Sequence, residues 1–204
     1  MTEPQQTAER TKSVEDGFAQ VPRLDIVYKI PAYNEPDYMP LNVLMSILGS
    51  GQSSRLYQKL VKEKELAANV FASAGARRAT GLATVIALVR PGGNMEEVEK
   101  VVYGEIEKVQ SEPVADWELE KVRLKYRHDH TAQLTSTLSR AVSLAYYTVA
   151  WNDPNVINTE ESRLDAVTKD DLLRVAKKYL TPANRSVITT IPKPKSAAGS
   201  AGEN

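Results

Sequence analysis

Hydrophobic and polar residues alternate strictly near the start of the chain. In the run RLDIVYKIP, Leu24, Ile26, Tyr28 and Ile30 occupy every second position. This period of two predicts a half-buried β-strand, which Pro31 ends. The next segment, PAYNEPDY, has the prolines and the asparagine that are typical of a turn.

After this turn the apolar residues recur at helical spacing as far as Gly49, which we interpret as a helix C-cap. The segment GSGQSS follows, and a second helix is predicted over about residues 55–64. GSGQSS therefore indicates a tight corner between two helices, with Ser53 or Ser54 as the N-cap of the second helix.

The middle of the chain predicts a hairpin and then helices. The runs ANVFASAG and TGLATVIALV are rich in small and β-branched residues, and their short connection favours an antiparallel hairpin. Asn94 is predicted to cap a helix that ends near Gln110. A longer helical pattern extends from about Asp116 to Val149 and is either continuous or broken near TSTLS. Its predicted apolar face comprises Leu119, Val122, Tyr126, His130, Leu134, Leu138, Ala141 and Ala145.

The last elements complete the order β-α-α-β-β-α-α-α-β. Thr168 and Asp171 resemble a capping box that opens a helix before Pro182, and RSVITTI predicts a final strand. This order predicts an α+β fold: a mainly antiparallel sheet with helices packed on one face. We expect one domain over residues 21–192, a polar N-terminal segment at 1–20 and a disordered tail at 193–204.

Composition narrows the possible partners. Lys plus Arg and Asp plus Glu both number 26, so the net charge gives no reason to expect nucleic acid as a partner. The sequence contains no cysteine, which excludes disulfides and Cys-ligated zinc. We expect no membrane span, because no apolar run approaches the roughly 20 residues that a spanning helix needs.

The candidate catalytic groups do not form a recognisable site. His128 and His130 are the only histidines, and residues two apart on a helix point in different directions, so we expect one packed and one surface histidine. A nucleophilic Ser53 or Ser54, as in an independent hydrolase, would need one of them as its base. The basic run KVRLKYRH is interpreted as a solvated face with local ion pairs to glutamates three residues earlier.

Three longer segments resemble a known family. They are LNVLMSILGSGQSSRLYQKLVKEKELAANVFAS, VRPGGNMEEVEKVVYGEIEKVQSEPVADWELEKVR and TKDDLLRVAKKYLTPANRSVITTIP. Together they resemble the C-terminal domain of the pitrilysin/insulinase zinc metallopeptidases, which include the mitochondrial processing peptidase. The resemblance covers about residues 24–192 and implies one half of a clam-shaped pair of similar α+β domains. In this family the N-terminal domain carries His-x-x-Glu-His, with two zinc ligands and a glutamate that activates the zinc-bound water.

The resemblance also identifies two substrate-binding positions. Many members place an Arg and a Tyr, seven residues apart, against the substrate. These positions fall on Val61 and Ala68, whose side chains cannot donate hydrogen bonds, so the pair is lost here. In some members a second chain carries the pair.

The resemblance thus implies a non-catalytic C-terminal domain of a zinc metalloendopeptidase. We expect it to enclose a peptide substrate against a zinc-bearing N-terminal domain that lies outside this chain, with zinc in that domain or in a partner. A second family chain carrying the Arg/Tyr pair is a further expected partner, and the chain alone should hold no zinc or other cofactor and be inactive. The alternative is a non-proteolytic structural or assembly module of the same fold. Export of bacterial members favours the periplasm or cell exterior.

Overall fold

A five-stranded sheet forms the base of the molecule in the computed structural model, which describes residues 6–193. Its strands are β1 (Arg10–Asp16), β2 (Arg23–Ile30), β3 (Ala67–Gly75), β4 (Gly81–Val89) and β5 (Arg185–Pro192). They lie in the order β1-β5-β2-β4-β3; β1 and β5 are parallel, and every other neighbouring pair is antiparallel. The predicted α+β fold with a mainly antiparallel sheet is confirmed.

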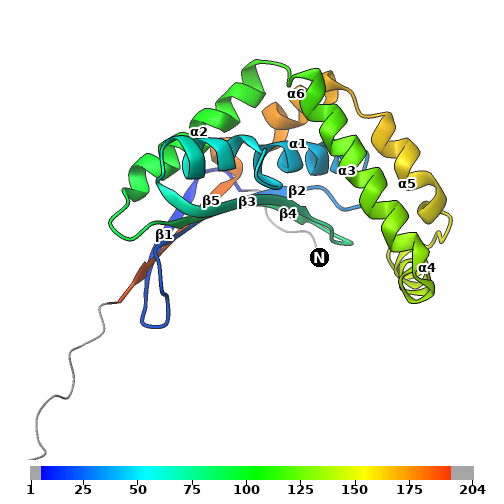
Figure 1. Cartoon of the computed structure of the whole chain (residues 1–204), viewed down its shortest axis with the longest axis horizontal. Coiled ribbons are helices and arrows are strands. Elements are labelled where there is room, and N and C mark those ends of the chain that lie inside the picture. Colours follow the sequence, from blue (N-terminus) through cyan, green and yellow to red (C-terminus); the bar gives the residue numbers. More distant parts are fainter. Residues whose placement is uncertain (1–5, 194–204) are drawn as a thin grey trace, which may run out of the picture.

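The helices lie on one face of this sheet (Figure 1). They are α1 (Tyr38–Gly49), the π-helix η1 (Tyr57–Glu63), α2 (Met95–Ser111), α3 (Asp116–Thr135), α4 (Thr137–Trp151), α5 (Val156–Asp165), α6 (Lys169–Tyr179) and the short 3₁₀ helix η2 (Pro182–Asn184). The long helical pattern is broken at Ser136, whose hydroxyl accepts from the Ser139 N–H and caps α4. Asn94 and Thr168 cap α2 and α6 as predicted.

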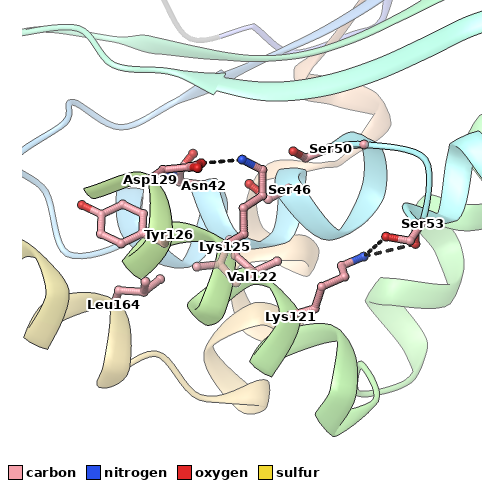
Figure 2. A pocket seen from close by; sticks show the side chains of 12 residues that line it. Asn42, Ser46, Ser50, Ser53, Lys121, Val122, Lys125, Tyr126, Asp129 and Leu164 are labelled. Atoms are coloured by element: carbon pink, nitrogen blue, oxygen red, sulfur yellow. Dashed lines mark hydrogen bonds and ion pairs between the residues drawn. The ribbon is translucent and has the colours of Figure 1, made fainter. Parts of the chain in front are cut away.

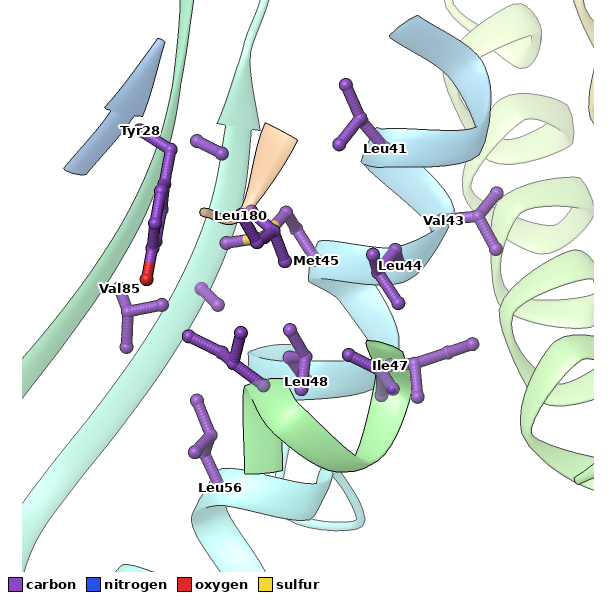
Figure 3. Packing of buried hydrophobic residues seen from close by; sticks show 14 of the residues in the cluster. Tyr28, Leu41, Val43, Leu44, Met45, Ile47, Leu48, Leu56, Val85 and Leu180 are labelled. Atoms are coloured by element: carbon purple, nitrogen blue, oxygen red, sulfur yellow. The ribbon is translucent and has the colours of Figure 1, made fainter. Parts of the chain in front are cut away.

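The core lies between the sheet and α1. The alternating residues of β2, Leu24 to Ile30, are at most 2% exposed, as their pattern predicts. Figure 3 shows the α1 side chains packed toward the strands on one side and the outer helices on the other. Every residue of α1 except Asn42 and Ser46 is buried. Because α1 is covered on both sides, Asn42 and Ser46 are the two positions of this helix at which the cover is incomplete.

Gly49 has a different role from the predicted C-cap. It is the last residue of α1, and Ser50 occupies the cap position. A Cβ atom on Gly49 would lie 2.2 Å from the backbone nitrogen of Ala72 in β3. The glycine therefore allows α1 to approach the sheet, while the positive φ of 78° at the corner belongs to Gly51.

Two elements differ from those that the sequence predicts. The segment 1–20, to which no strand was assigned, contributes β1, whose residues lack an apolar alternation because the strand is at the edge of the sheet and almost fully exposed. Helix α5 was not predicted. The expected tail lies outside the described residues, except for Lys193.

The predicted apolar face of the long helical pattern is correct only in its first half. In α3, Leu119 and Val122 are buried. In α4, Leu138 is 74% exposed, and Ala141 and Ala145 are exposed as well. The break at Ser136 is the physical reason, since α4 starts with a new direction and buries a different face.

Candidate functional site

The corner GSGQSS is held by hydrogen bonds within the protein. Ser54 is fully buried, and its hydroxyl donates to the Gly51 carbonyl at 2.7 Å. Its own carbonyl accepts from the Gln58 N–H at 3.0 Å, so Ser54 lies where the next helical turn begins. The predicted serine N-cap is wrong, because η1 has Leu56 at its N-cap position and no side chain caps it. Ser53 accepts from the Lys121 ammonium through its carbonyl at 3.1 Å and its hydroxyl at 3.3 Å. Both serines are therefore engaged with groups other than a histidine.

An ion pair fastens this corner to the start of α3. The Arg55 guanidinium donates to both carboxylate oxygens of Glu118, with Nε–Oε1 at 2.7 Å and Nη2–Oε2 at 2.6 Å. Glu118 also accepts from the Ala115 N–H at 2.9 Å. Burial pushes the pKa of Glu118 upward, but these hydrogen bonds outweigh it and lower the pKa. The local pair predicted between Glu118 and Lys121 is wrong, whereas the one between Glu120 and Arg123 forms at 2.5 Å.

A cavity of about 280 Å³ opens between α1, the corner and α3 (Figure 2). Its apolar lining comes from Val43, Val122 and Leu164. Its polar lining comprises Asn42, Ser46 and Ser50 near α1, Ser53 in the corner, and Lys121, Lys125, Tyr126 and Asp129 on α3. The only two residues of α1 that are not buried thus both face this cavity.

The two lysines that line the cavity differ in whether they form an ion pair with a carboxylate. Lys125 pairs with Asp129 at 2.5 Å, so this cation is neutralised. Lys121 donates to neutral oxygens of Ser53, and burial lowers the pKa of its ammonium group. Together with the amide of Asn42, Lys121 gives the cavity the donors to hold a carbonyl or carboxylate group.

The two histidines lie in different surroundings. Within residues 6–193, no group of three or more His, Cys, Asp or Glu side chains could hold a metal ion. The side chain of His128 is 82% exposed and lies 3.2 Å from Asp129. His130 is half-buried and stacks on Tyr126, with ring centroids 5.9 Å apart. The expected division into one packed and one surface histidine agrees with this placement.

The two family positions have different environments. Val61 lies in η1 and is only 9% exposed. Ala68 lies in the edge strand β3, at the irregularity between Ala67 and Asn69, and is exposed. Neither side chain carries a polar group, and their proposed relation to substrate stays a prediction.

A buried carboxylate outside the cavity is not apparent from the sequence pattern. Glu160 is 8% exposed and accepts from the hydroxyls of Tyr33 at 3.0 Å and Tyr147 at 2.5 Å. These bonds join the loop before α1 to α4 and α5.

The cavity residues were not predicted either, although their spacing in the sequence is regular. Lys121, Lys125 and Asp129 recur every four residues, as do Asn42, Ser46 and Ser50, so each set lies on one side of a helix. Their meeting depends on how α1 and α3 pack.

None of the helices in residues 6–193 combines the length and apolar character that crossing a membrane requires.

Comparison with known proteins identifies relatives of this chain. The family model described as "Peptidase M16 inactive domain" matches residues 2–126. The chain is similar to the zinc protease PqqE of Helicobacter pylori, with 27% identity over 94% of this chain and 43% of that protein. A solved protease from Helicobacter pylori superposes with a TM-score of 0.88 at 26% identity, covering 94% of this chain and 46% of that one.

A solved inactive peptidase domain from Bordetella parapertussis superposes with a TM-score of 0.77 at 29% identity, covering 87% of this chain and 95% of that chain. The chain therefore spans less than half the length of the Helicobacter proteins, whereas the Bordetella chain consists almost entirely of this fold.

Proposed function

Because the chain belongs to the family of peptidase M16 inactive domains, we propose that it encloses a peptide substrate as the non-catalytic C-terminal half of a zinc metalloendopeptidase. The match to this family model confirms the resemblance to the pitrilysin/insulinase peptidases that the sequence indicates. The observation that carries the proposal is the family match over residues 2–126, in a chain that spans 43% of a zinc protease.

The zinc belongs, in this proposal, to the N-terminal half of the parent or to a partner. The described residues do not fit a zinc site, since no suitable group of ligands occurs among them. A zinc peptidase needs ligands and a base beside an open coordination position. This chain would instead form a wall of the chamber, and the cavity between α1 and α3 could hold a polar group of the enclosed peptide.

The missing Arg/Tyr pair suggests a further partner. Val61 and Ala68 offer no hydrogen-bond donors to substrate, so a second family chain that carries the pair would complete the site. Because bacterial family members are often exported, we place the parent in the periplasm or at the cell exterior. Neither the enclosure of a substrate by this chain nor its completion by a second family chain requires a membrane span.

Zinc analysis tests the proposal directly. We expect the purified chain to bind no stoichiometric zinc and to cleave no peptide, and the full parent to bind zinc and to lose peptidase activity with a chelator. One zinc per molecule of this chain, measured by elemental analysis, would refute the assignment.

The second candidate function is a non-proteolytic structural or assembly module. The loss of both polar groups at Val61 and Ala68 favours it. The remaining sequence of the parent discriminates: His-x-x-Glu-His supports the peptidase, and its absence supports the module.

A further inference from the structure

Lys121 is the charged group of the cavity between α1 and α3 that lacks an oppositely charged partner. The nearest acidic residue on its own helix, Glu118, is held by the Arg55 guanidinium through both carboxylate oxygens. Within residues 6–193, no carboxylate lies at ion-pair distance from the Lys121 ammonium, whose hydrogen bonds go to the carbonyl and the hydroxyl of Ser53. An ammonium group has three donors, so at least one remains for a ligand.

Uncharged donors lie on the α1 side of the same cavity (Figure 2). Asn42 and Ser46 are one turn apart on α1, and Ser50 follows the end of that helix. Because α1 is packed between the sheet and the outer helices, its backbone holds these side chains in fixed positions. Amide and hydroxyl donors beside an ammonium group are the partners that a carboxylate accepts from.

The charges around the cavity favour a ligand with one negative charge and no positive charge. Lys125 and Asp129 form an ion pair at 2.5 Å and neutralise each other, which leaves the charge of Lys121. Burial lowers the pKa of Lys121, and a bound carboxylate would instead stabilise its charged form. Among the residues that line the cavity, Asp129 is the only carboxylate, and its pairing leaves no partner for the ammonium group of a free amino acid. The lining therefore suits an acylated carboxylate.

The apolar part of the cavity can take one side chain. Val43, Val122 and Leu164 line a volume of about 280 Å³, at the small end of the range of roughly 300–1,000 Å³ for ligand pockets. One terminal residue with an apolar side chain matches this size and lining. We propose that the cavity binds the free C-terminal carboxylate of a peptide, with the carboxylate at Lys121 and the last side chain against the apolar wall. This inference rests on the proposed function and names the part of the enclosed peptide that this chain holds.

Calorimetric titration of this chain tests the proposal with a matched pair of ligands. One is an acetylated tripeptide that ends in leucine with a free carboxylate, and the other is the same tripeptide with a terminal amide. We expect the carboxylate form to bind at least about tenfold more tightly, because only this form carries a charge opposite to that of Lys121. Free leucine and isocaproate, which have the same side chain and a carboxylate but no peptide bond, should bind more weakly than the tripeptide.

Two variants locate the site. Lys121→Met removes the charge and keeps an unbranched side chain, so the preference for the carboxylate form should disappear. Ser46→Leu fills the cavity from α1 and should abolish binding of the carboxylate form. The matched control is Lys177→Met, which removes an exposed lysine of α6 outside the cavity and should leave the affinity for both tripeptides unchanged. A melting curve of each variant establishes that it is folded before it is titrated.

Equal affinity for the two tripeptides, or no binding of the carboxylate form at millimolar concentration, overturns the proposal. An unchanged preference in Lys121→Met does the same. Binding of isocaproate or free leucine as tightly as the tripeptide also overturns it, because the occupant would then be a small carboxylate. Zinc content and peptide cleavage are measured separately on the parent. Their absence would reject the peptidase function, while tighter binding of the carboxylate form to this chain would still support the site.

Discussion

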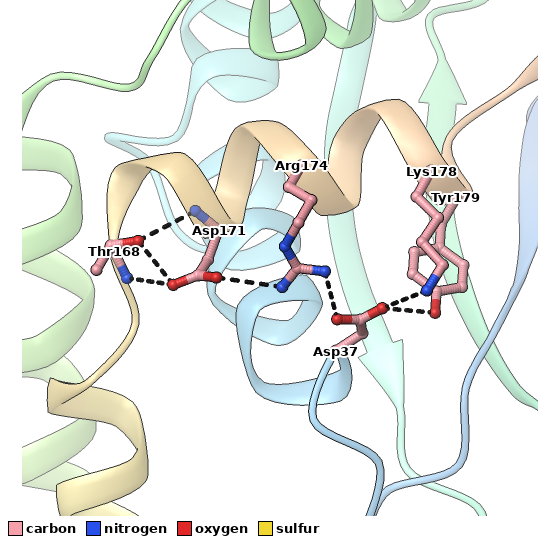
Figure 4. A network of polar contacts seen from close by, with 6 residues as sticks. All are labelled: Asp37, Thr168, Asp171, Arg174, Lys178 and Tyr179. Carbon is pink, nitrogen blue, oxygen red and sulfur yellow. Dashed lines mark hydrogen bonds and ion pairs between the residues drawn. The ribbon is translucent and has the colours of Figure 1, made fainter.

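Asp37 connects the start of α1 to α6, and its removal is the sharpest test of the packing described above. Its Oδ1 accepts from Arg174 Nη1 at 2.6 Å, and its Oδ2 accepts from Lys178 Nζ and the Tyr179 hydroxyl, both at 2.8 Å (Figure 4). The Asp37 side chain is 13% exposed. One carboxylate thus serves three donors from a helix far along the chain, and Asp37→Asn would weaken all three bonds.

The pKa gives the size of the effect. Burial alone would raise the pKa of Asp37, but the three hydrogen bonds outweigh it and lower the pKa from 3.8 to about 2. At roughly 1.36 kcal/mol per pKa unit, this corresponds to an upper limit of about 2.4 kcal/mol. The side chains of Arg174 and Lys178 are 49% and 58% exposed. Because solvent screens such pairs, we expect Asp37→Asn to cost about 1–1.5 kcal/mol, or about 3–5 °C in melting temperature.

The sign of the pH dependence follows from the lowered pKa. The folded state holds Asp37 ionised more strongly than the unfolded state does, so its contribution is present above about pH 4 and is lost as the pH falls toward about 2. Urea unfolding of the unsubstituted protein and of Asp37→Asn, at neutral pH and near about pH 3, measures this contribution. The difference between their free energies of unfolding should fall by about half from neutral pH to about pH 3. Glu35→Gln, an exposed change in the same loop, is the control. A difference that stays constant with pH would show that Asp37 does not act through its charge.

Three further predictions concern packing and the family positions. Gly49→Ala should destabilise the protein by about 3 kcal/mol in thermal melts, because its Cβ would meet the β3 backbone, while Gly104→Ala, which meets nothing within 4 Å, should be neutral or stabilising. Glu118→Gln should cost about 2 kcal/mol in chemical denaturation, because it removes the charge from a largely buried bidentate pair; no loss would contradict this. Val61→Arg should lower the melting temperature, because the site is 9% exposed, whereas Ala68→Tyr on the exposed edge should not; the reverse order would be inconsistent with their placement.

Local signals predicted the elements that depend on neighbouring residues. The strand at Leu24 to Ile30 follows from alternation, and the caps at Asn94 and Thr168 follow from side chains that bond to the next turn. Strand β1 was missed because its pairing with β5, far along the chain, stabilises a segment with no apolar alternation. The cavity was missed for the same reason, since two helices from distant segments form it.

The polar groups of the corner differ in their surroundings from the exposed apolar side chains of α4. A catalytic centre needs reactive groups that are free to meet substrate. In the corner, the hydroxyls of Ser53 and Ser54 and the charges of Arg55 and Glu118 are all engaged within the chain. On α4, by contrast, the large apolar side chains of Leu138, Val142 and Val149 are 74%, 59% and 69% exposed. Exposed apolar surface of this kind is typical of contact with another protein surface, which agrees with the role in enclosing a substrate that we propose above.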